Sequence, residues 1–420
     1  MAAAGVQFAG EAPALSARAE FASRWPVLLG ATLGIGVGVI ALPSPAIGVF
    51  MRDLQAEFGW SRTEISLGPT ILIAGLALAS PVLGWIADRV SAAWISGVSL
   101  AALAAFLFLF SRLGPDIRLY YAGFAAMAVT ACGAATLVYA RVVSANFVKG
   151  RGLALGVAMV GNGLTGIFLP MLLAPYAASA GWRQGFVALA VLAALAAPLV
   201  AGLMSLSRPQ VQAVTEDGVP AGESFEAALR DRAFWTMAVA FVLIPLGAGG
   251  MHLHLMAFLA DEGMSPAQAG AVASLGGVAL IVGRVLTGWL IDHAFAPWVA
   301  AGMMAISAAC MALMGLFGAP AGWLGAVAVG LSIGAELDLI GYLTARYFGM
   351  RAYGRIYGVL YAAVLVGSAL SPLAYGQASD LTGSYATALF GGAAALMAAA
   401  LLFLTLRRFP DADGAPVRPE

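Results

Sequence analysis

Long apolar segments separated by short polar ones run the whole length of the chain. Each segment is close to the roughly 20 residues that an α-helix needs to cross the hydrocarbon core of a bilayer. We therefore predict an all-α membrane protein with twelve spans. The first six are 25–50, 65–86, 94–110, 119–140, 153–174 and 186–205, and the second six are 234–259, 267–291, 298–317, 321–343, 356–378 and 386–406.

The longest polar interruption separates the first six spans from the second six. It contains Pro209 and Pro220 within a polar run, which is typical of a flexible linker. Its last part has Phe225 and Leu229 at helical spacing and predicts a short helix, either on the inner membrane surface or solvated. The predicted domains are a cytoplasmic N-terminal tail (1–24), a six-helix bundle (25–205), a cytoplasmic linker (206–232), a second six-helix bundle (233–406) and a cytoplasmic C-terminal tail (407–420).

Composition and charge support a membrane location. The 420 residues are 61% hydrophobic and 10% charged, whereas soluble domains carry about a quarter charged residues. With the N-terminus inside, 15 of the 21 Lys and Arg residues fall on the cytoplasmic side, 5 on the outer side and one, Arg284, within a span. Because short cytoplasmic loops collect basic residues, we predict both termini in the cytoplasm and the protein in the plasma membrane, the inner membrane of a bacterium.

Several function classes lack their sequence signals. No P-loop is present and the linker is too short for an ATPase domain, so a gradient must drive any transport. We find no nucleophile–base pair or metal-ligand cluster and predict neither an enzyme nor a cofactor. Cys132 and Cys310 fall inside spans, which favours packing over a disulfide. We expect no nucleic-acid partner and a protein that functions as a monomer in the lipid bilayer.

An internal repeat relates the two halves. The segment GWIAD at 84–88 ends the second span, and GWLID at 288–292 ends the eighth, 204 residues later. The same offset aligns SRTE at 61–64 with SPAQ at 265–268, two capping-box patterns that start helices. Matching signals at both ends of one helix indicate parallel six-span halves, an arrangement of transporters that rock about a midplane site.

These features resemble the major facilitator superfamily over nearly the whole chain. The pattern GxxxDR at 84–89 is similar to the family's signature after the second helix, in which the acid helps to hold the cytoplasmic side closed. The resemblance implies a major facilitator fold of twelve transmembrane helices in two pseudo-symmetric six-helix bundles. It implies a gating role for Asp88, with Arg141 as candidate partner. We also assign Asp292 and Arg346, at the cytoplasmic ends of the eighth and tenth spans, to gating.

More specific stretches are similar to the monocarboxylate transporter branch and to its bacterial relatives that exchange oxalate and formate. They are FGWSR at 58–62, FVKGRGLALG at 147–156, GWR at 181–183, GRVLTG at 283–288, and YFG at 347–349 followed by GRIYG at 354–358. In this branch the arginine of the eighth helix binds the carboxylate. The resemblance therefore implies a small organic carboxylate anion as substrate and Arg284 as its anchor.

Arg284 lies inside an otherwise apolar span, where a fixed positive charge costs roughly 3 kcal/mol or more. Three interpretations compete. The guanidinium binds a carboxylate of the substrate through its planar fork, it forms a permanent ion pair with Asp338 or Glu336, or it reaches back toward the cytoplasm. We favour the first, because charges within membrane spans usually serve function.

Glu336 and Asp338 are carboxylates inside the tenth span. Asp338 and Arg284 each lie eight residues, about 12 Å, from the inner boundary, so we predict a similar depth for both. Glu336 lies further out and on nearly the opposite face. Burial opposes ionisation of a carboxyl group and a nearby arginine favours it, so either acid can exchange a proton as an anion enters and leaves. The alternative is a fixed polar contact with another helix.

Three further side chains are candidate substrate contacts. His254 lies toward the outer end of the seventh span. The resemblance favours it as an anion contact or proton relay over a packing histidine. Tyr139 in the fourth span and Tyr342 in the tenth can donate hydroxyl groups to a carboxylate, or are interfacial aromatics near the cytoplasmic ends of their spans.

We therefore predict a secondary active transporter that moves a small organic monocarboxylate by alternating access. The acids at 336 and 338 favour symport with a proton over coupling to a counter-anion. One alternative is an exchanger for a small mono- or dicarboxylate, which would benefit from a second cation within the spans. The other is a membrane sensor that binds its ligand without transporting it.

Overall fold

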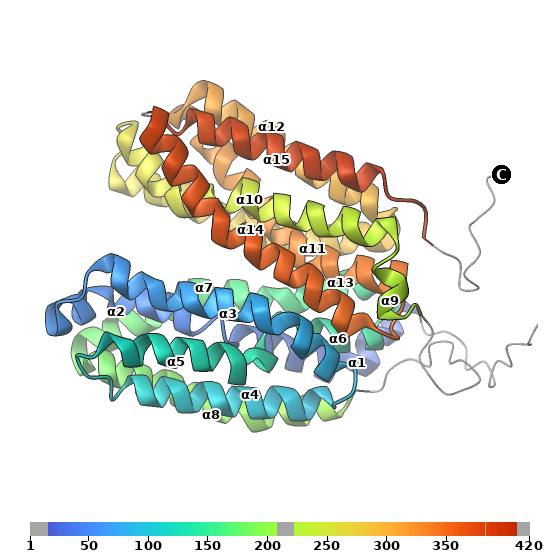
Figure 1. Ribbon diagram of the computed structural model, residues 1–420, viewed down its shortest axis with the longest axis horizontal. Coiled ribbons are helices and arrows are strands. Elements are labelled where there is room, and N and C mark those ends of the chain that lie inside the picture. Colours follow the sequence, from blue (N-terminus) through green and yellow to red (C-terminus); the bar gives the residue numbers. More distant parts are fainter. Residues whose placement is uncertain (1–15, 208–221, 383, 410–420) are drawn as a thin grey trace, which may run out of the picture.

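The structure, a computed structural model, describes residues 16–207, 222–382 and 384–409, and these residues are nearly all helical (Figure 1). The first half contains α1 (Ala17–Gly36), α2 (Pro43–Phe58), α3 (Arg62–Ala87), α4 (Ala92–Phe110), α5 (Ile117–Thr130), the 3-10 turn η1 (Cys132–Ala134), α6 (Thr136–Asn146), α7 (Arg151–Ala180) and α8 (Trp182–Ser205). The second half contains α9 (Phe225–Ala228), α10 (Arg232–Asp261), α11 (Pro266–His293), α12 (Ala296–Phe317), η2 (Ala319–Ala321), α13 (Gly322–Phe348), α14 (Tyr353–Thr382) and α15 (Ala386–Leu404). Most of the predicted tails and linker, at 1–15, 208–221 and 410–420, lies outside the described residues.

The described residues include ten helices that are long and apolar enough to cross a membrane, which confirms an all-α membrane protein. They are α3, α4, α7, α8 and α10 to α15. The predicted first and fourth spans are each divided between two shorter helices, α1 with α2 and α5 with α6. The total of twelve spans therefore stays a prediction.

The first helix begins earlier than predicted. Ser16 caps α1 by accepting a hydrogen bond from the backbone N–H of Ala19, so residues from 17 onward are helical rather than part of a tail. Glu20 explains why this polar turn is ordered. Its carboxylate accepts hydrogen bonds from the backbone of the loop before α7, at Val148 and Gly150 among others. Such a contact is not visible in a hydropathy pattern.

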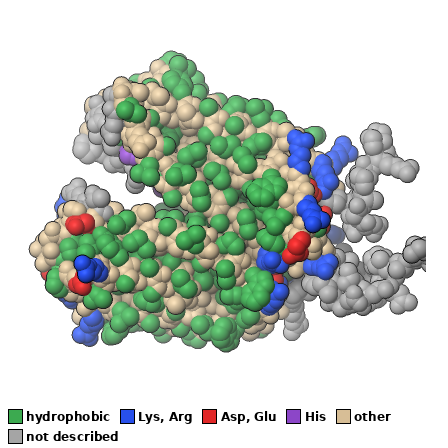
Figure 2. Space-filling model, viewed as in Figure 1, with side chains coloured by type: hydrophobic (Ala, Val, Ile, Leu, Met, Phe, Trp, Pro, Cys, Tyr) green, Lys and Arg blue, Asp and Glu red, His purple; other side chains and the backbone are tan. Residues whose placement is uncertain are grey.

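The two halves converge at one end of the molecule and diverge at the other (Figure 1). They converge where α9 lies, on the right of the figure, and we call this the closed end. The space-filling view shows the molecule hollowed between the halves at the opposite end, the open end (Figure 2). Apolar side chains cover much of the visible face, and Lys and Arg gather at the closed end (Figure 2). The apolar flank fits a lipid environment.

The predicted capping boxes begin the two equivalent helices. At the start of α3, Ser61 accepts a hydrogen bond from the Glu64 N–H, and the Glu64 carboxylate accepts one from the Ser61 N–H. At the start of α11, Ser265 and Gln268 make the same reciprocal pair. Each box satisfies N–H groups that a helix start leaves unpaired. The 204-residue repeat is thus present in the structure at this end of both helices.

Candidate transport site

Two interrupted helices meet in the middle of the first half. The α1 helix ends at Gly36 and the chain turns before α2 begins at Pro43, while η1 separates α5 from α6. The backbone N–H of Val39 donates to the carbonyl oxygen of Ala134, 3.4 Å away, so the two interruptions are bonded to each other. Irregular backbone inside a membrane protein is tolerated where protein or a cavity surrounds it. Both interruptions border a cavity here.

The cavity lies between the two halves and has a volume of about 220 Å³. This is below the roughly 300–1,000 Å³ of pockets for drug-sized molecules, so it suits a small ligand. Its polar side chains come from both halves and are Thr136, Asn162, Arg284, Glu336, Tyr361 and Ser368. The rest of the lining is apolar or backbone, including the interruptions at Gly38 and Ala134.

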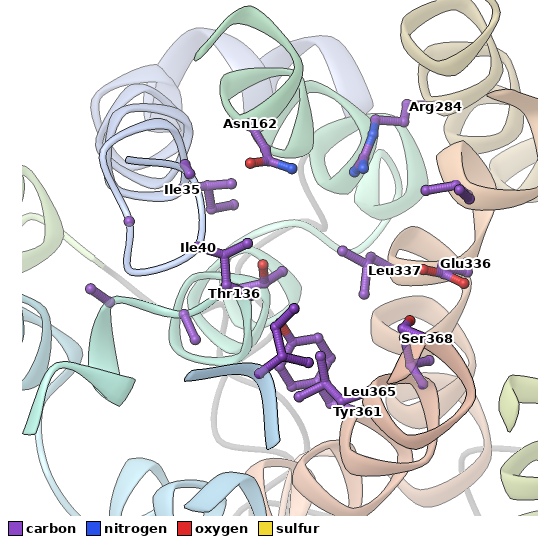
Figure 3. Close-up of a pocket in the computed structure, with 17 residues that line it drawn as sticks. Ile35, Ile40, Thr136, Asn162, Arg284, Glu336, Leu337, Tyr361, Leu365 and Ser368 are labelled. Atoms are coloured by element: carbon purple, nitrogen blue, oxygen red, sulfur yellow. The ribbon is translucent and has the colours of Figure 1, made fainter. Parts of the chain in front are cut away.

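Arg284 projects from α11 into this cavity (Figure 3). The residue is only 2% exposed, and its Nε and Nη1 atoms have no hydrogen-bond partner. The ion pairs formed by the described residues do not include it. A buried guanidinium with two unpaired nitrogens is costly, and an anion in the cavity would satisfy them.

The two predicted acids of α13 have different surroundings. Glu336 lines the cavity, and its Oε2 atom has no hydrogen-bond partner (Figure 3). Asp338 is fully buried outside the lining, and both of its carboxylate oxygens lack partners. Arg284 attracts both carboxyl groups electrostatically, yet neither lies within the 4.0 Å of a salt bridge. Arg284 therefore forms no ion pair with Glu336 or Asp338 in this conformation.

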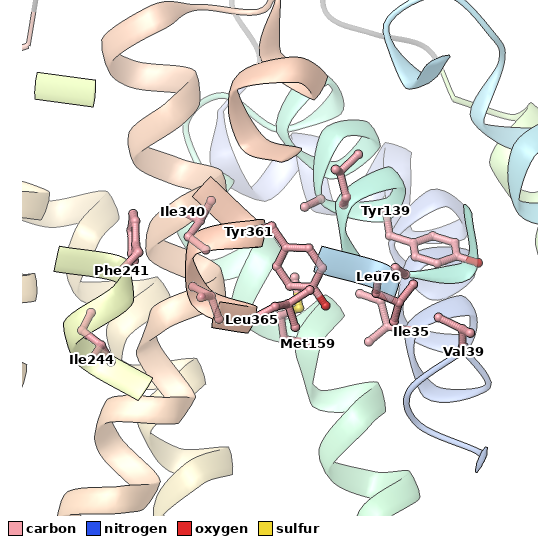
Figure 4. Close-up of a cluster of buried hydrophobic side chains, with 14 of the residues drawn as sticks. Ile35, Val39, Leu76, Tyr139, Met159, Phe241, Ile244, Ile340, Tyr361 and Leu365 are labelled. Carbon is pink, nitrogen blue, oxygen red and sulfur yellow. The ribbon is translucent and has the colours of Figure 1, made fainter. Parts of the chain in front are cut away.

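Three tyrosines follow one face of α14 between the closed end and the cavity. Tyr353, Tyr357 and Tyr361 are four residues apart, with ring centroids separated by 5.7 and 6.1 Å. Tyr361 borders the cavity, and Figure 4 shows it within a cluster of buried apolar side chains that includes Met159 and Leu365. The buried Tyr357 hydroxyl has no hydrogen-bond partner and lies in the electrostatic field of Asp338. Tyr357 is therefore a second polar neighbour of Asp338, in addition to Arg284.

The other predicted substrate contacts lie outside the cavity lining. Tyr139 is buried against α1, where a side chain at Gly34 would overlap its ring, and its hydroxyl has no partner (Figure 4). Tyr342 packs near Phe409, with ring centroids 6.4 Å apart.

His254 is held by other groups in this conformation. Its Nδ1 atom lies 3.3 Å from the Tyr385 hydroxyl, and its Nε2 atom lies 3.4 Å from the carbonyl oxygen of Pro372. The structure thus brings Arg284 and Glu336 together at the cavity, but not His254 or the two tyrosines.

Asp88 joins the two halves at the closed end. Its carboxylate accepts hydrogen bonds from the backbone N–H groups of Gly354 (2.8 Å) and Arg355 (3.1 Å), in the first turn of α14. It also forms the predicted ion pair with Arg141, 3.1 Å from Nε to Oδ1. A carboxylate at a helix N-terminus is stabilised by unpaired N–H groups and by the helix dipole.

Asp292 repeats this arrangement in the other half. Its oxygens accept hydrogen bonds from the backbone N–H groups of Gly152 (2.7 Å) and Leu153 (2.9 Å), in the first turn of α7. Arg346, which we also assigned to gating, does not pair with it and instead lies over the ring of Phe409. Because Asp292 binds backbone N–H groups, a search of the sequence for oppositely charged side chains could not identify its partners.

Close helix crossings accompany both aspartates. A methyl group at Gly84 would overlap the carbonyl oxygen of Gly354, and one at Gly354 would overlap that of Gly84. Gly288 and Gly152 show the same reciprocal contact between α11 and α7. Only glycine permits backbones to approach this closely. The closed end is therefore sealed by two equivalent crossings, each secured by an aspartate.

Sequence reasoning missed several residues of the cavity. Thr136, Asn162 and Ser368 are uncharged polar residues in otherwise apolar helices, and many such residues bond their own helix backbone instead. Tyr361 belongs to a regular tyrosine spacing that could have been noticed, but the spacing alone does not say which ring reaches the cavity.

A helical membrane protein with two related halves, sealed at one end and with a charged cavity between them, has the architecture of a transporter. The chain belongs to the Major Facilitator Superfamily, whose family model matches residues 27–372. The fold predicted from the sequence is confirmed. Because this is a family of transporters, the prediction that the protein is not an enzyme is confirmed as well.

Curated relatives extend over most of the chain. It is 28% identical over 378 residues to monocarboxylate transporter 13 of Bos taurus, covering 87% of this chain and 85% of that protein. It is 23% identical over 373 residues to human monocarboxylate transporter 11, covering 86% and 79%. An uncharacterised 38 kDa protein of Thermoproteus tenax is 30% identical over 343 residues, covering 80% and 84%.

Solved structures share the fold at low sequence identity. The fucose:proton symporter of E. coli superposes with a TM-score of 0.70 at 18% identity and covers 90% of this chain and 98% of that chain. The human organic anion transporter MFSD10 gives a TM-score of 0.70 at 15% identity, covering 91% and 99%. The chain is thus a major facilitator transporter with monocarboxylate transporters among its relatives.

Proposed function

We propose that the protein is a secondary active transporter that carries a small organic monocarboxylate together with a proton. One observation carries this proposal: Arg284 is buried, lines the cavity between the halves, and has two guanidinium nitrogens without partners. A guanidinium fork binds a carboxylate through two parallel hydrogen bonds. The names of the curated relatives support the same substrate class.

The size and lining of the cavity favour a short acid. Beside Arg284, Asn162 and Ser368 can form hydrogen bonds with a second polar group of the ligand, while Ile35 and Leu365 contribute apolar surface. Arg284 is the only lysine or arginine in the lining given by the described residues. A dicarboxylate would therefore bring one charge that meets no second cation and lies beside Glu336.

Glu336 and Asp338 are the proposed proton carriers. An anion entering beside an ionised Glu336 meets like-charge repulsion, and protonation of that carboxyl removes it. Asp338 lies behind the lining and shares the field of Arg284, so binding of an anion to Arg284 weakens the stabilisation of an ionised Asp338. Uptake of the anion and uptake of the proton thus favour each other.

The closed end provides the proposed inner gate. Separation of the α3–α14 and α11–α7 crossings would release Asp88 and Asp292 from the helix starts that they cap. Rocking of the two halves about the cavity then exposes the site to the other side. In this proposal the closed end and both termini face the cytoplasm, the protein is in the inner membrane of a bacterium, and one chain suffices for transport.

The experiment is uptake into liposomes that contain only the purified protein. Labelled lactate, pyruvate and oxalate are offered with and without an inward proton gradient, and with or without unlabelled anion inside. We expect accumulation of the monocarboxylates with the gradient and no need for internal anion. Uptake that ignores the gradient but requires internal anion would establish an exchanger, and binding without any uptake would establish a sensor.

A further inference from the structure

Two opposite charges border the cavity without touching. Arg284 reaches it from α11 and Glu336 from α13 (Figure 3). They form no ion pair within 4.0 Å, and Arg284 Nε, Arg284 Nη1 and Glu336 Oε2 have no hydrogen-bond partner among the described residues. Separated charges in a site of low polarity are best satisfied by a ligand that carries the complementary charge for each.

Few other titratable groups act on Glu336. Of the helices packed against α13, α11 brings Arg284 and α14 brings Tyr361 into its electrostatic field. Nearer the closed end, Arg151 of α7 acts electrostatically on Tyr342 of α13, and the Tyr353 hydroxyl of α14 donates to the carbonyl oxygen of Gly341. The cavity therefore offers one strong positive and one strong negative site.

We infer that the cavity also accepts small zwitterions, namely amino acids with a short aliphatic side chain. The carboxylate binds Arg284 and the ammonium group binds Glu336. Ile35, Ile40 and Leu337 in the lining provide apolar surface for the side chain. This inference rests on the proposed function, because it uses the same cavity and the same arginine.

The two substrate classes then differ in their need for a proton. A monocarboxylate binds beside Glu336 once that carboxyl is protonated, because protonation removes the repulsion between two negative groups. A zwitterion brings its own positive charge, which pairs with ionised Glu336. Monocarboxylate binding is therefore favoured at low pH, and zwitterion binding is not.

Lactate and alanine form a matched pair for the test, since they differ only in a hydroxyl or an ammonium group at the second carbon. Exchange of each labelled compound is measured in liposomes preloaded with the same unlabelled compound, at pH 6 and pH 8. For the unmodified protein we expect lactate exchange to fall several-fold from pH 6 to pH 8 and alanine exchange to rise over the same range, because the two ligands require opposite protonation states of Glu336.

The variant Glu336→Gln separates the two ligands, because it keeps the shape of the side chain and removes its charge. We expect alanine exchange to fall at least 30-fold, while lactate exchange persists and loses its pH dependence. Glu57→Gln is the matched control, since Glu57 pairs with Arg183 outside the cavity. It should leave both exchanges unchanged.

The outcomes separate this inference from the proposed function. If the unmodified protein exchanges lactate but not alanine, or if Glu336→Gln exchanges alanine normally, the inference is overturned and monocarboxylate transport stands. If the unmodified protein exchanges alanine but no monocarboxylate, the proposed function fails instead. A loss of both exchanges in Glu336→Gln, with normal folding by size-exclusion chromatography, would also overturn the inference.

Discussion

Helix α3 of the first half crosses α14 of the second half with Ser80 and Gly84 on the contact face. Helix α11 of the second half crosses α7 of the first half with Arg284 and Gly288 at the equivalent positions. The backbone carbonyl of Ser80 faces Gly358, and that of Arg284 faces Gly156. The two crossings thus share their backbone geometry. They differ in one side chain, because Ser80 bonds to its own helix whereas Arg284 enters the cavity.

This comparison separates what the fold requires from what the site adds. Closely packed glycines and a capping aspartate recur at both crossings. This is expected if each half contributes one of the two contacts that hold the closed end together. The arginine occurs once, so the crossing geometry does not demand it. The first half contributes interrupted backbone and uncharged polar groups to the cavity, and the second half contributes the charges.

Loss of the arginine should have the largest effect. For Arg284→Ala we expect transport to fall by about 30-fold or more, since removal of one partner of a buried charge pair costs roughly 2–5 kcal/mol. Ser80→Ala at the equivalent position should change transport less than threefold. Initial rates of labelled lactate uptake measure both. Similar losses in the two variants would show that the crossing, and not the guanidinium, is what matters.

Disruption of the glycine contacts should affect both crossings alike. Gly84→Val and Gly288→Val each insert side-chain atoms where a carbonyl oxygen now lies, and overpacking costs about 1–3 kcal/mol. We expect the closed end to open about 5- to 150-fold more often in either variant. Distances between spin labels at Val90 and Trp298, with Cys132 and Cys310 replaced, report this population. A shift in one variant only would break the equivalence of the crossings.

The aspartates should reveal a smaller asymmetry. Asp292→Asn removes a charged cap from α7 and should weaken the closed end by roughly 0.5–1.5 kcal/mol. Asp88→Asn removes the same cap from α14 and also the Arg141 ion pair, which adds about 0.2–1 kcal/mol.

Arg141→Gln tests the source of this difference, and the same spin-label distances serve as readout. In the double variant with Asp88→Asn, the two effects should be less than additive, because both remove one ion pair. Strict additivity would mean that the pair contributes nothing to closure.

The smallest effect concerns a pair outside both crossings. The hydrogen bond from Arg183 to Glu57 at the open end lowers the pKa of Glu57 below its usual 4.5. A lowered pKa in the folded state means that the stabilisation is present above pH 4.5 and is lost as the pH falls through the folded-state value. Glu57→Gln should therefore cost less than about 1 kcal/mol at pH 7, and less still at pH 3. Thermal unfolding at the two pH values measures this, and a changed spin-label distance would contradict the assignment.

Much of this organisation could be predicted from the sequence. Hydropathy located the continuous helices, and the repeat at 84–88 and 288–292 identified the two equivalent helices. Helical counting placed Arg284 and Asp338 at a similar depth, and Arg284 acts electrostatically on Asp338 in the structure. The Asp88–Arg141 pair is present. These features depend on residue type and spacing, which a sequence contains directly.

Other features depend on contacts that a sequence does not state. The interruptions at 37–42 and 131–135 are apolar, so they do not disturb a hydropathy pattern. Asp292 binds backbone N–H groups, which every residue but proline has, so residue type alone did not identify its partners. Tyr139 has suitable chemistry for a substrate contact, but its ring packs against Gly34 and it does not line the cavity.

The most direct test of the account is the steady-state accumulation of labelled lactate in liposomes at a fixed proton gradient. A gradient of one pH unit stores about 1.4 kcal/mol, so coupling of one proton to one monocarboxylate sustains at most about tenfold accumulation. We predict accumulation approaching tenfold for the unmodified protein and none for Arg284→Ala. Equal lactate concentrations inside and outside, or accumulation that survives Arg284→Ala, would contradict the account.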